Sequence, residues 1–253
     1  MGTGEDLLLL AVDDRHARTR GGVRLAAALA AAHLVDLAAA ERITLDGTRL
    51  RVTRIEPVGD ELLDPAVAAI AKSTSPVTVH RWLTGHAHPA VIARYATAAR
   101  AAGTVKTDET LSYDRDKARV RRSEPRINVA DESARDQIVA RVSAALALPG
   151  TVATAPVPVQ DVALAVLVDA VGLTKLYLGS RSDRQARARL SELATGKSGG
   201  LPDPDRTVMS IARSAHRMLS QWKETDPGPA IEIGPIPMSA QWVIKNAGAV
   251  GGV

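Results

Sequence analysis

The sequence predicts a mainly α protein: a single helical-bundle domain with buried, Ala/Leu-rich central helices and small β-hairpins. Two long segments, 23–40 and 161–179, are apolar nearly all round, which is typical of helices at the centre of a helical domain. Hydrophobic residues make up 45% of the chain, much of it alanine, and phenylalanine is absent. Small side chains let neighbouring helices approach closely, which favours tightly packed helices over an aromatic-rich sandwich.

The apolar segment 23–40 raises the question of a membrane span. Its most apolar part, from Leu25 to Ala40, is shorter than the roughly 20 residues that a spanning helix needs. It also carries His33 and Asp36 near its centre, and alanine is only weakly hydrophobic. We therefore predict a buried helix of a soluble protein. Because a buried carboxylate needs a partner, we expect Asp36 to brace a loop or a helix end.

Local signals predict the other elements of the N-terminal half. Thr3 can cap a first helix that runs to about Val12. An Asp-Gly pair between alternating apolar positions predicts a hairpin over 43–52. Asp60 can cap the next helix, whose apolar residues recur at helical spacing. Three more elements are expected: a short helix at 77–83, a helix from Pro89 to Ala102, and a basic hairpin from Thr104 to Arg122.

The C-terminal half is predicted to be helical up to its tail. Asp131 can cap a helix with one apolar stripe, which consists of Ile138, Val142, Ala145 and Leu146. Three further helices are expected over 161–179, 181–196 and 205–223. The composition then becomes rich in Pro and Gly, so we predict a domain over 1–225 and a Pro/Gly-rich C-terminal tail over 226–253.

Composition and charge restrict the function. Without cysteine, the chain has no disulfide, thiolate metal site or cysteine nucleophile. The N-terminus lacks the basic region of a signal peptide and Asp6 breaks the myristoylation pattern, so we expect a cytoplasmic protein. The net charge is only +4, but arginines cluster over 15–24 and over 115–126. Such clusters are either solvated loops or contacts for the phosphates of lipid or nucleic acid.

No catalytic constellation can be assembled from the sequence, and we predict a protein that is no enzyme and holds neither metal nor cofactor. A Gly-Lys-Ser triplet resembles part of a phosphate-binding loop, but Ser191 replaces the first glycine of that motif and a helix precedes it. His86 and His88 have no third metal ligand nearby in the sequence. Ser220 and Lys223 have the spacing of a nucleophile and its base without any supporting motif.

Several segments follow one another in an informative order: "GEDLLLLAVDD", "LAAAHLVDLAAAERITL", "VGDELLDPAVAAIAKS", "VIARYATAARAAGTV" and "RINVADESARDQIVARVSAAL". In this order they resemble the Golgi phosphoprotein 3 family in its actinobacterial form, over roughly residues 3 to 222. The resemblance implies a mostly helical single domain with small hairpins. It also implies a peripheral membrane or adaptor protein, since eukaryotic members bind phosphatidylinositol 4-phosphate at Golgi membranes and recruit partners there.

The resemblance further implies a headgroup pocket, but the four pocket residues of the eukaryotic members are replaced here. The family's tryptophan before the core helix corresponds to Gly21, and its arginine within that helix to Ala30. Two arginines on the later helix correspond to Pro89 and Ile92. Other arginines nearby could rebuild a concave basic site between the loop at 15–24 and the helix that begins near Pro89, since arginine suits phosphate geometry. The predicted headgroup-binding residues are Arg18, Arg20, Arg24 and Arg94.

We accordingly expect a non-enzymatic protein that binds an anionic phospholipid or phosphoinositide headgroup, or a protein partner, at a membrane surface. A homo-oligomer is compatible with this interpretation. The alternative is a winged-helix-like DNA-binding protein, because a helix precedes the basic hairpin. That helix offers only Arg94 and Arg100 as long basic side chains and lacks Asn and Gln, which disfavours nucleic acid as the partner.

Overall fold

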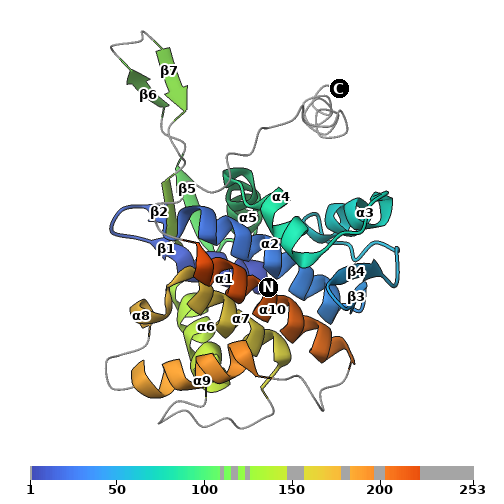
Figure 1. Ribbon diagram of the computed structural model, residues 1–253. Helices are drawn as coiled ribbons and strands as arrows, with labels where there is room; N and C mark the ends of the chain where they lie inside the picture. The colour runs from blue at the N-terminus through green and yellow to red at the C-terminus, as the bar shows by residue number, and fades with distance from the viewer. Residues whose placement is uncertain are drawn as a thin grey trace. The chain divides into compact units, whose positions relative to one another are not determined.

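The computed structural model describes residues 2–108, 111–114, 119–122, 126–146, 157–177, 183–196 and 203–222. Within these residues the protein is mainly α, as predicted, and its strands form only two-stranded sheets (Figure 1). The helices of the described residues are α1 (Thr3–Ala11), α2 (Gly22–Ala39), α3 (Leu63–Lys72), α4 (Val79–His86), α5 (Pro89–Ala101), α6 (Glu132–Ala145), α7 (Val159–Val171), α8 (Thr174–Tyr177), α9 (Asp183–Thr195) and α10 (Asp203–Gln221).

The described strands form antiparallel pairs. They are β1 (Val12–Asp13), β2 (Arg18–Thr19), β3 (Ile43–Asp46), β4 (Arg49–Val52), β5 (Val105–Asp108), β6 (Leu111–Asp114), β7 (Arg119–Arg122) and β8 (Arg126–Val129). The hairpin predicted over 43–52 is confirmed as β3 and β4, with Asp46 opposite Arg49 across the turn. The basic hairpin predicted from Thr104 to Arg122 is confirmed as an antiparallel hairpin, but its predicted end is too early. The pair of β6 and β7 lies within the pair of β5 and β8, because β8 continues beyond Arg122 to pair with β5.

Helix α2 is the centre of the domain and confirms the predicted core helix. Figure 1 shows it passing through the middle of the domain, with α4 and α5 on one side and α1, α7 and α10 on the other, and all five contact it. By length and composition α2 could cross a membrane, but 72% of it is buried inside the domain. Its apolar surface is therefore covered by protein.

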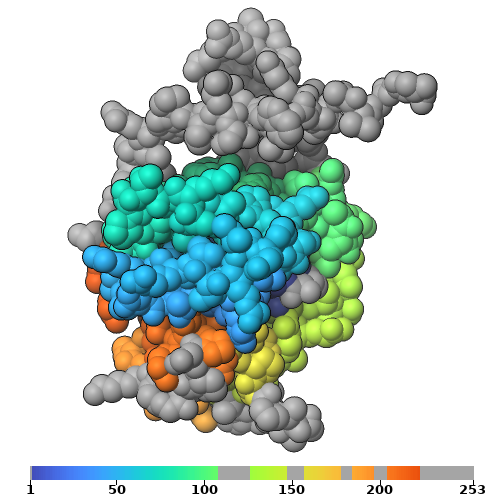
Figure 2. Space-filling model, turned by 90° about the vertical axis from the view of Figure 1, so that its right-hand side faces the viewer, coloured from blue at the N-terminus to red at the C-terminus, as the bar shows by residue number. Residues whose placement is uncertain are grey.

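The alanines of α2 explain how so many helices surround it. Ala27, Ala28, Ala31 and Ala32 are fully buried, and a methyl side chain lets a neighbouring helix approach closely. The approach of α4 is direct evidence, because the indole N–H of Trp82 donates to the backbone carbonyl of Ala30 over 3.0 Å. The light-blue and cyan residues of β3, β4 and α3 form the outer face that Figure 2 shows, with orange residues of α10 below them.

Two predicted helix caps are confirmed and one is wrong. Asp60 accepts the backbone N–H groups of Leu62 and Leu63 at the start of α3, and Asp131 accepts that of Ala134 in α6. Thr3 does not cap α1, because Gly2 occupies the N-cap position.

The cap of α1 comes instead from another helix. The backbone N–H of Thr3 donates to Oδ1 of Asp36 in α2 over 3.0 Å. This contact confirms the expectation that Asp36 braces a helix end, and it satisfies one of the free N–H groups of the first helical turn.

The C-terminal tail over 226–253 lies outside the described residues, so the domain boundary at 225 remains a prediction. The described chain ends at Trp222, just after α10.

Replacing Ala31 or Leu34 by Asp should unfold or aggregate the protein. Both side chains are fully buried in α2, and an unpaired buried charge destabilises a fold by about 4 kcal/mol. Thermal unfolding followed by circular dichroism measures the effect. The matched control is Ala93→Asp, the same change at an exposed position of α5. An Ala31→Asp protein that melts at the wild-type temperature would contradict the burial of α2.

Candidate functional site

Three of the four predicted headgroup-binding arginines lie around the start of α2. Arg18 is exposed on β2. Arg20 forms an ion pair with Asp13, with Nη2 at 2.7 Å from Oδ2. Arg24, in the first turn of α2, donates to the backbone carbonyl of Trp222. The structure thus brings these three residues to one end of the domain.

Two of these arginines also have structural partners. Asp13 is only 6% exposed, and a hydrogen bond with His16, together with the charge of Arg20, lowers the pKa of Asp13. Arg20 therefore compensates a buried carboxylate, and Arg24 fastens α2 to the end of α10. Within the described residues, Arg15 and Arg18 are the exposed cations of this loop without a hydrogen bond or ion pair from their side chains.

The fourth predicted residue, Arg94, lies elsewhere. Its Nη2 donates to the backbone carbonyl of Glu61 over 3.3 Å. Its neighbour Tyr95 stacks on His33, with ring centroids 5.0 Å apart. His33 follows Arg24 by nine residues in α2, which is about 14 Å along a helix axis. Arg94 is therefore nearer to the other end of α2, and no hydrogen bond or ion pair within the described residues joins it to the loop. A headgroup-binding role for these residues remains a prediction.

At two of the four positions that correspond to the family's pocket, the structure has no place for the residue of the eukaryotic members. A Cβ atom on Gly21 would come within 2.5 Å of Cγ1 of Val171, at a φ of +92° that favours glycine. Ala30 is fully buried beneath Trp82, so an arginine there would be a buried cation. Pro89 is exposed at the start of α5 and Ile92 is half-buried.

The two basic clusters of the sequence meet on one side of the domain. The backbone N–H of Ile127 in β8 donates to the carbonyl of Ala17 over 2.9 Å. The N–H of Val129 donates to Asp14 over 2.9 Å. We call the exposed residues Arg15, Arg18 and Arg126, together with the start of α2, the basic edge. The chain continues from β5 and β8 into β6 and β7, and the side chains of the arginines on β7 lie outside the described residues.

The start of α2 adds a partial positive charge to the basic edge. Gly21 and Gly22 are exposed, and no side chain caps the helix. The first N–H groups of α2 therefore have no capping side chain among the described residues, and the helix dipole favours an anion there.

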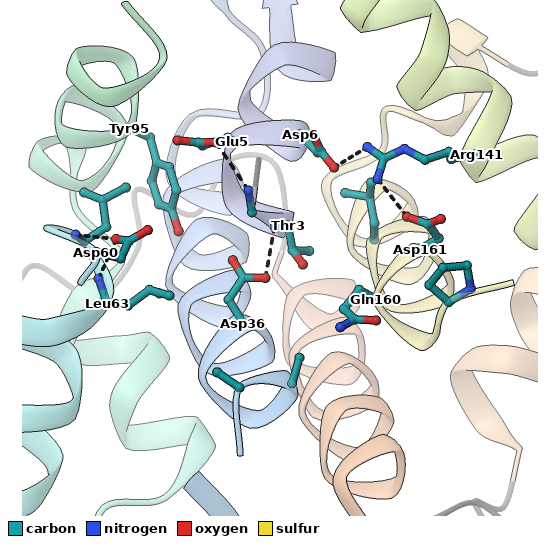
Figure 3. A pocket seen from close by; sticks show the side chains of 16 residues that line it. Thr3, Glu5, Asp6, Asp36, Asp60, Leu63, Tyr95, Arg141, Gln160 and Asp161 are labelled. Carbon is teal, nitrogen blue, oxygen red and sulfur yellow. Dashed lines mark hydrogen bonds and ion pairs between the residues drawn. The ribbon is translucent and has the colours of Figure 1, made fainter. Parts of the chain in front are cut away.

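A cavity of about 560 Å³ lies at the other end of α2, between the start of α1, the end of α2, and residues of α3, α5, α6 and α7 (Figure 3). Its described lining is strongly acidic. The ionisable lining residues are Glu5, Asp6, Asp36, Asp60, Asp161, Tyr95 and Arg141. We call this the acidic cavity.

One side of the acidic cavity is neutralised by Arg141, as Figure 3 shows. Its Nη1 lies 3.1 Å from Oδ1 of Asp161, and its Nη2 donates to Asp6. Burial raises the pKa of both carboxyl groups, and Arg141 opposes that effect. This ion triad ties α1, α6 and α7 together.

The other side of the acidic cavity has no cation among its described lining residues. Asp36 is half-buried there, and burial raises the pKa of Asp36 to about 6 although the N–H of Thr3 stabilises the charged form. Tyr95 is 2% exposed, and its hydroxyl has no hydrogen-bond partner among the described residues. Burial raises the pKa of Tyr95 far above its usual value.

His33 stacks on Tyr95, which lines this side of the cavity. It is 3% exposed, and neither ring nitrogen has a hydrogen-bond partner in the described residues. Burial lowers the pKa of His33 to about 4, so the ring is neutral at physiological pH.

In the sequence, Asp36 is unusual as a carboxylate within an apolar helix, but no sequence pattern predicts the acidic cavity. One sequence feature could have indicated the cavity residues: Asp6, Asp36 and Asp161 each interrupt or adjoin a strongly apolar helical segment. An ionisable residue in such a run indicates a partner from another element, but the run does not say which one.

No group of three or more His, Asp or Glu side chains with the arrangement of a metal site occurs in the described residues. His86 instead stacks on Trp82 at 3.8 Å, and its Nδ1 lies 2.8 Å from the Trp82 carbonyl oxygen.

The family comparison agrees with the resemblance found in the sequence. The family model described as Golgi phosphoprotein 3 matches residues 4–215. No curated protein matches the chain.

Asp36→Asn should stabilise the protein relative to wild type as the pH rises from 4 to 7. A raised folded-state pKa means that the stabilisation by Asp36 is fully present below 3.8 and is lost as the pH passes about 6. The difference from 3.8 to about 6 corresponds to about 3 kcal/mol. The amide oxygen of the substituted side chain can still accept the N–H of Thr3. Urea unfolding of both proteins at several pH values measures the change, and a difference that does not vary with pH would contradict it.

Proposed function

Because the chain belongs to the Golgi phosphoprotein 3 family, we propose that it is a non-enzymatic peripheral membrane protein of the cytoplasm, which binds anionic phospholipid headgroups through the basic edge. The observation that carries this proposal is the hydrogen bond between Ala17 and Ile127. It joins two basic segments that are about a hundred residues apart in the sequence, so their charges act on one surface.

The electrostatics of the basic edge support contact with an anionic surface. Arg15 and Arg18 are exposed and uncompensated within the described residues, and the start of α2 adds its dipole. Each arginine close to an anionic membrane contributes about 1 kcal/mol of binding. A few such residues give weak, salt-sensitive binding, which is typical of a peripheral protein.

The described residues do not favour one phosphoinositide over other anionic lipids. The eukaryotic pocket residues are absent, and position 21 has no room for a large side chain. The acidic cavity would repel a phosphate, because among its described lining residues the carboxylates outnumber the one arginine. The proposal is therefore recognition of anionic charge in general, with phosphatidylinositol 4-phosphate bound no better than other lipids of equal charge.

Replacing Arg18, Arg20 and Arg24 by Ala should weaken binding to anionic vesicles by about 3 kcal/mol, roughly a hundredfold. Sedimentation with vesicles of phosphatidylcholine, with and without phosphatidylserine or phosphatidylinositol 4-phosphate, measures it. Arg20 and Arg24 have structural partners, so the double variant Arg15→Ala with Arg18→Ala tests the edge without disturbing them. Its expected loss is about 2 kcal/mol.

The matched control is the double variant Arg49→Ala with Arg81→Ala. Both arginines are exposed beside the contact between β4 and the start of α4, away from the basic edge, so vesicle binding should not change. Loss of binding only on replacing Arg119, Arg121 and Arg122 would move the surface to the hairpin of β6 and β7. A shift of random duplex DNA without any vesicle binding would favour the DNA-binding alternative.

A further inference from the structure

The acidic cavity has an imbalance of charge that the described part of the domain does not correct. Among the described lining residues, five carboxylates face one guanidinium, that of Arg141. Both terminal nitrogens of Arg141 are already engaged by Asp6 and Asp161. On the opposite side, Glu5, Asp36 and Asp60 are met by backbone N–H groups and, at Asp36, also by the side chain of Thr3. No cation among the described residues donates to these three carboxylates. A cation on that side would lower the electrostatic energy of the cavity.

A second and independent observation is the hydroxyl of Tyr95. The residue is 2% exposed, lines the acidic cavity and has no hydrogen-bond partner among the described residues. Figure 3 shows its oxygen directed toward the side of the cavity that Asp36 and Asp60 form. Oδ1 of Asp6, 3% exposed as a residue, is likewise without a partner within the described chain. Buried polar atoms are normally paired, so unpaired ones that line a cavity point to a ligand.

The chemistry of the lining limits the ligand. A volume of about 560 Å³ is that of a small-molecule site. The described carboxylates do not come close enough together to form a metal-binding group. An organic cation can instead donate hydrogen bonds to carboxylates that lie further apart. Apolar walls stand beside the carboxylates and suit a short carbon chain; they are Ala39, Leu62, Leu63 and Leu164.

We propose that the acidic cavity binds a small organic cation, whose ammonium or guanidinium group lies between Asp36, Asp60 and the hydroxyl of Tyr95. The carbon chain of the ligand packs on the leucines. The cation comes from a free amine or from a basic side chain of a peptide. This inference goes beyond membrane binding, since the acidic cavity and the basic edge lie at opposite ends of α2 and neither depends on the other.

Isothermal titration of the full chain at constant ionic strength tests the proposal. Putrescine and agmatine should bind, and 1,4-butanediol, which has the shape of putrescine without its charge, should not. A short arginine-containing peptide and its citrulline counterpart distinguish a peptide source from a free amine. Peptide binding that depends on arginine, together with weaker binding of the free amines, would assign the site to a protein partner's side chain.

Variants distinguish binding in the acidic cavity from nonspecific attraction of a cation to carboxylates on the surface. Asp36→Asn should weaken cation binding about tenfold, because a hydrogen bond to a charged group contributes that much. The matched control Asp46→Asn removes an exposed carboxylate of β3 that pairs with Arg51 and should leave binding unchanged. Tyr95→Phe should also weaken binding, while it leaves the melting temperature unchanged or raises it, because the hydroxyl it removes has no partner within the described residues.

Any of three results overturns the proposal. The first is binding of the neutral diol as tight as that of the diamine. The second is an Asp36→Asn protein that binds the diamine as Asp46→Asn does. The third is absence of binding at about 10 mM amine, above the millimolar range of weak ligands. If Asp36→Asn fails to fold, the comparison of Tyr95→Phe with wild type decides in its place.

Discussion

The close packing of six described helices around α2 is the constraint on which the rest of the structure depends. An 18-residue helix with no polar face must be covered on every side. Alanine makes this coverage dense enough for Trp82 to reach the backbone at Ala30. Because the middle of α2 is covered by apolar side chains, most of its polar contacts lie at its two ends, where it meets loops and other helix termini. Both candidate sites lie at these ends.

The polar residues that remain inside α2 have opposite effects on stability. The pKa of His33 is lowered to about 4, so the unfolded state binds more protons and stability falls as the pH drops below 6.5. The pKa of Asp36 is raised to about 6, so stability falls as the pH rises from 3.8. Between pH 4 and 6 the two dependences oppose one another. Burial causes both shifts, because it disfavours the charged form of each group.

The ends of α2 also differ in charge. The basic edge lies at its N-terminus, where the helix dipole is positive, and the acidic cavity lies at its C-terminal third. The full length of the helix is about 27 Å. In the proposed orientation on a membrane, the carboxylates point away from the anionic surface and oppose its binding little, since that distance exceeds the screening length at physiological salt. A cation in the acidic cavity would then be bound without competing with lipid.

The sequence by itself determined the local features: the core helix, the hairpin over 43–52, the caps Asp60 and Asp131, and the family. Each is encoded by residues within a few positions of one another, through periodicity, turn chemistry or a short segment. Only the tertiary structure decided which charges meet. It separated Arg94 from the loop arginines, gave α1 its cap from Asp36, and assembled a cavity from six helices. Hydrophobic periodicity tells which residues are buried, but the partner of a buried charge is set by how helices distant in sequence pack together.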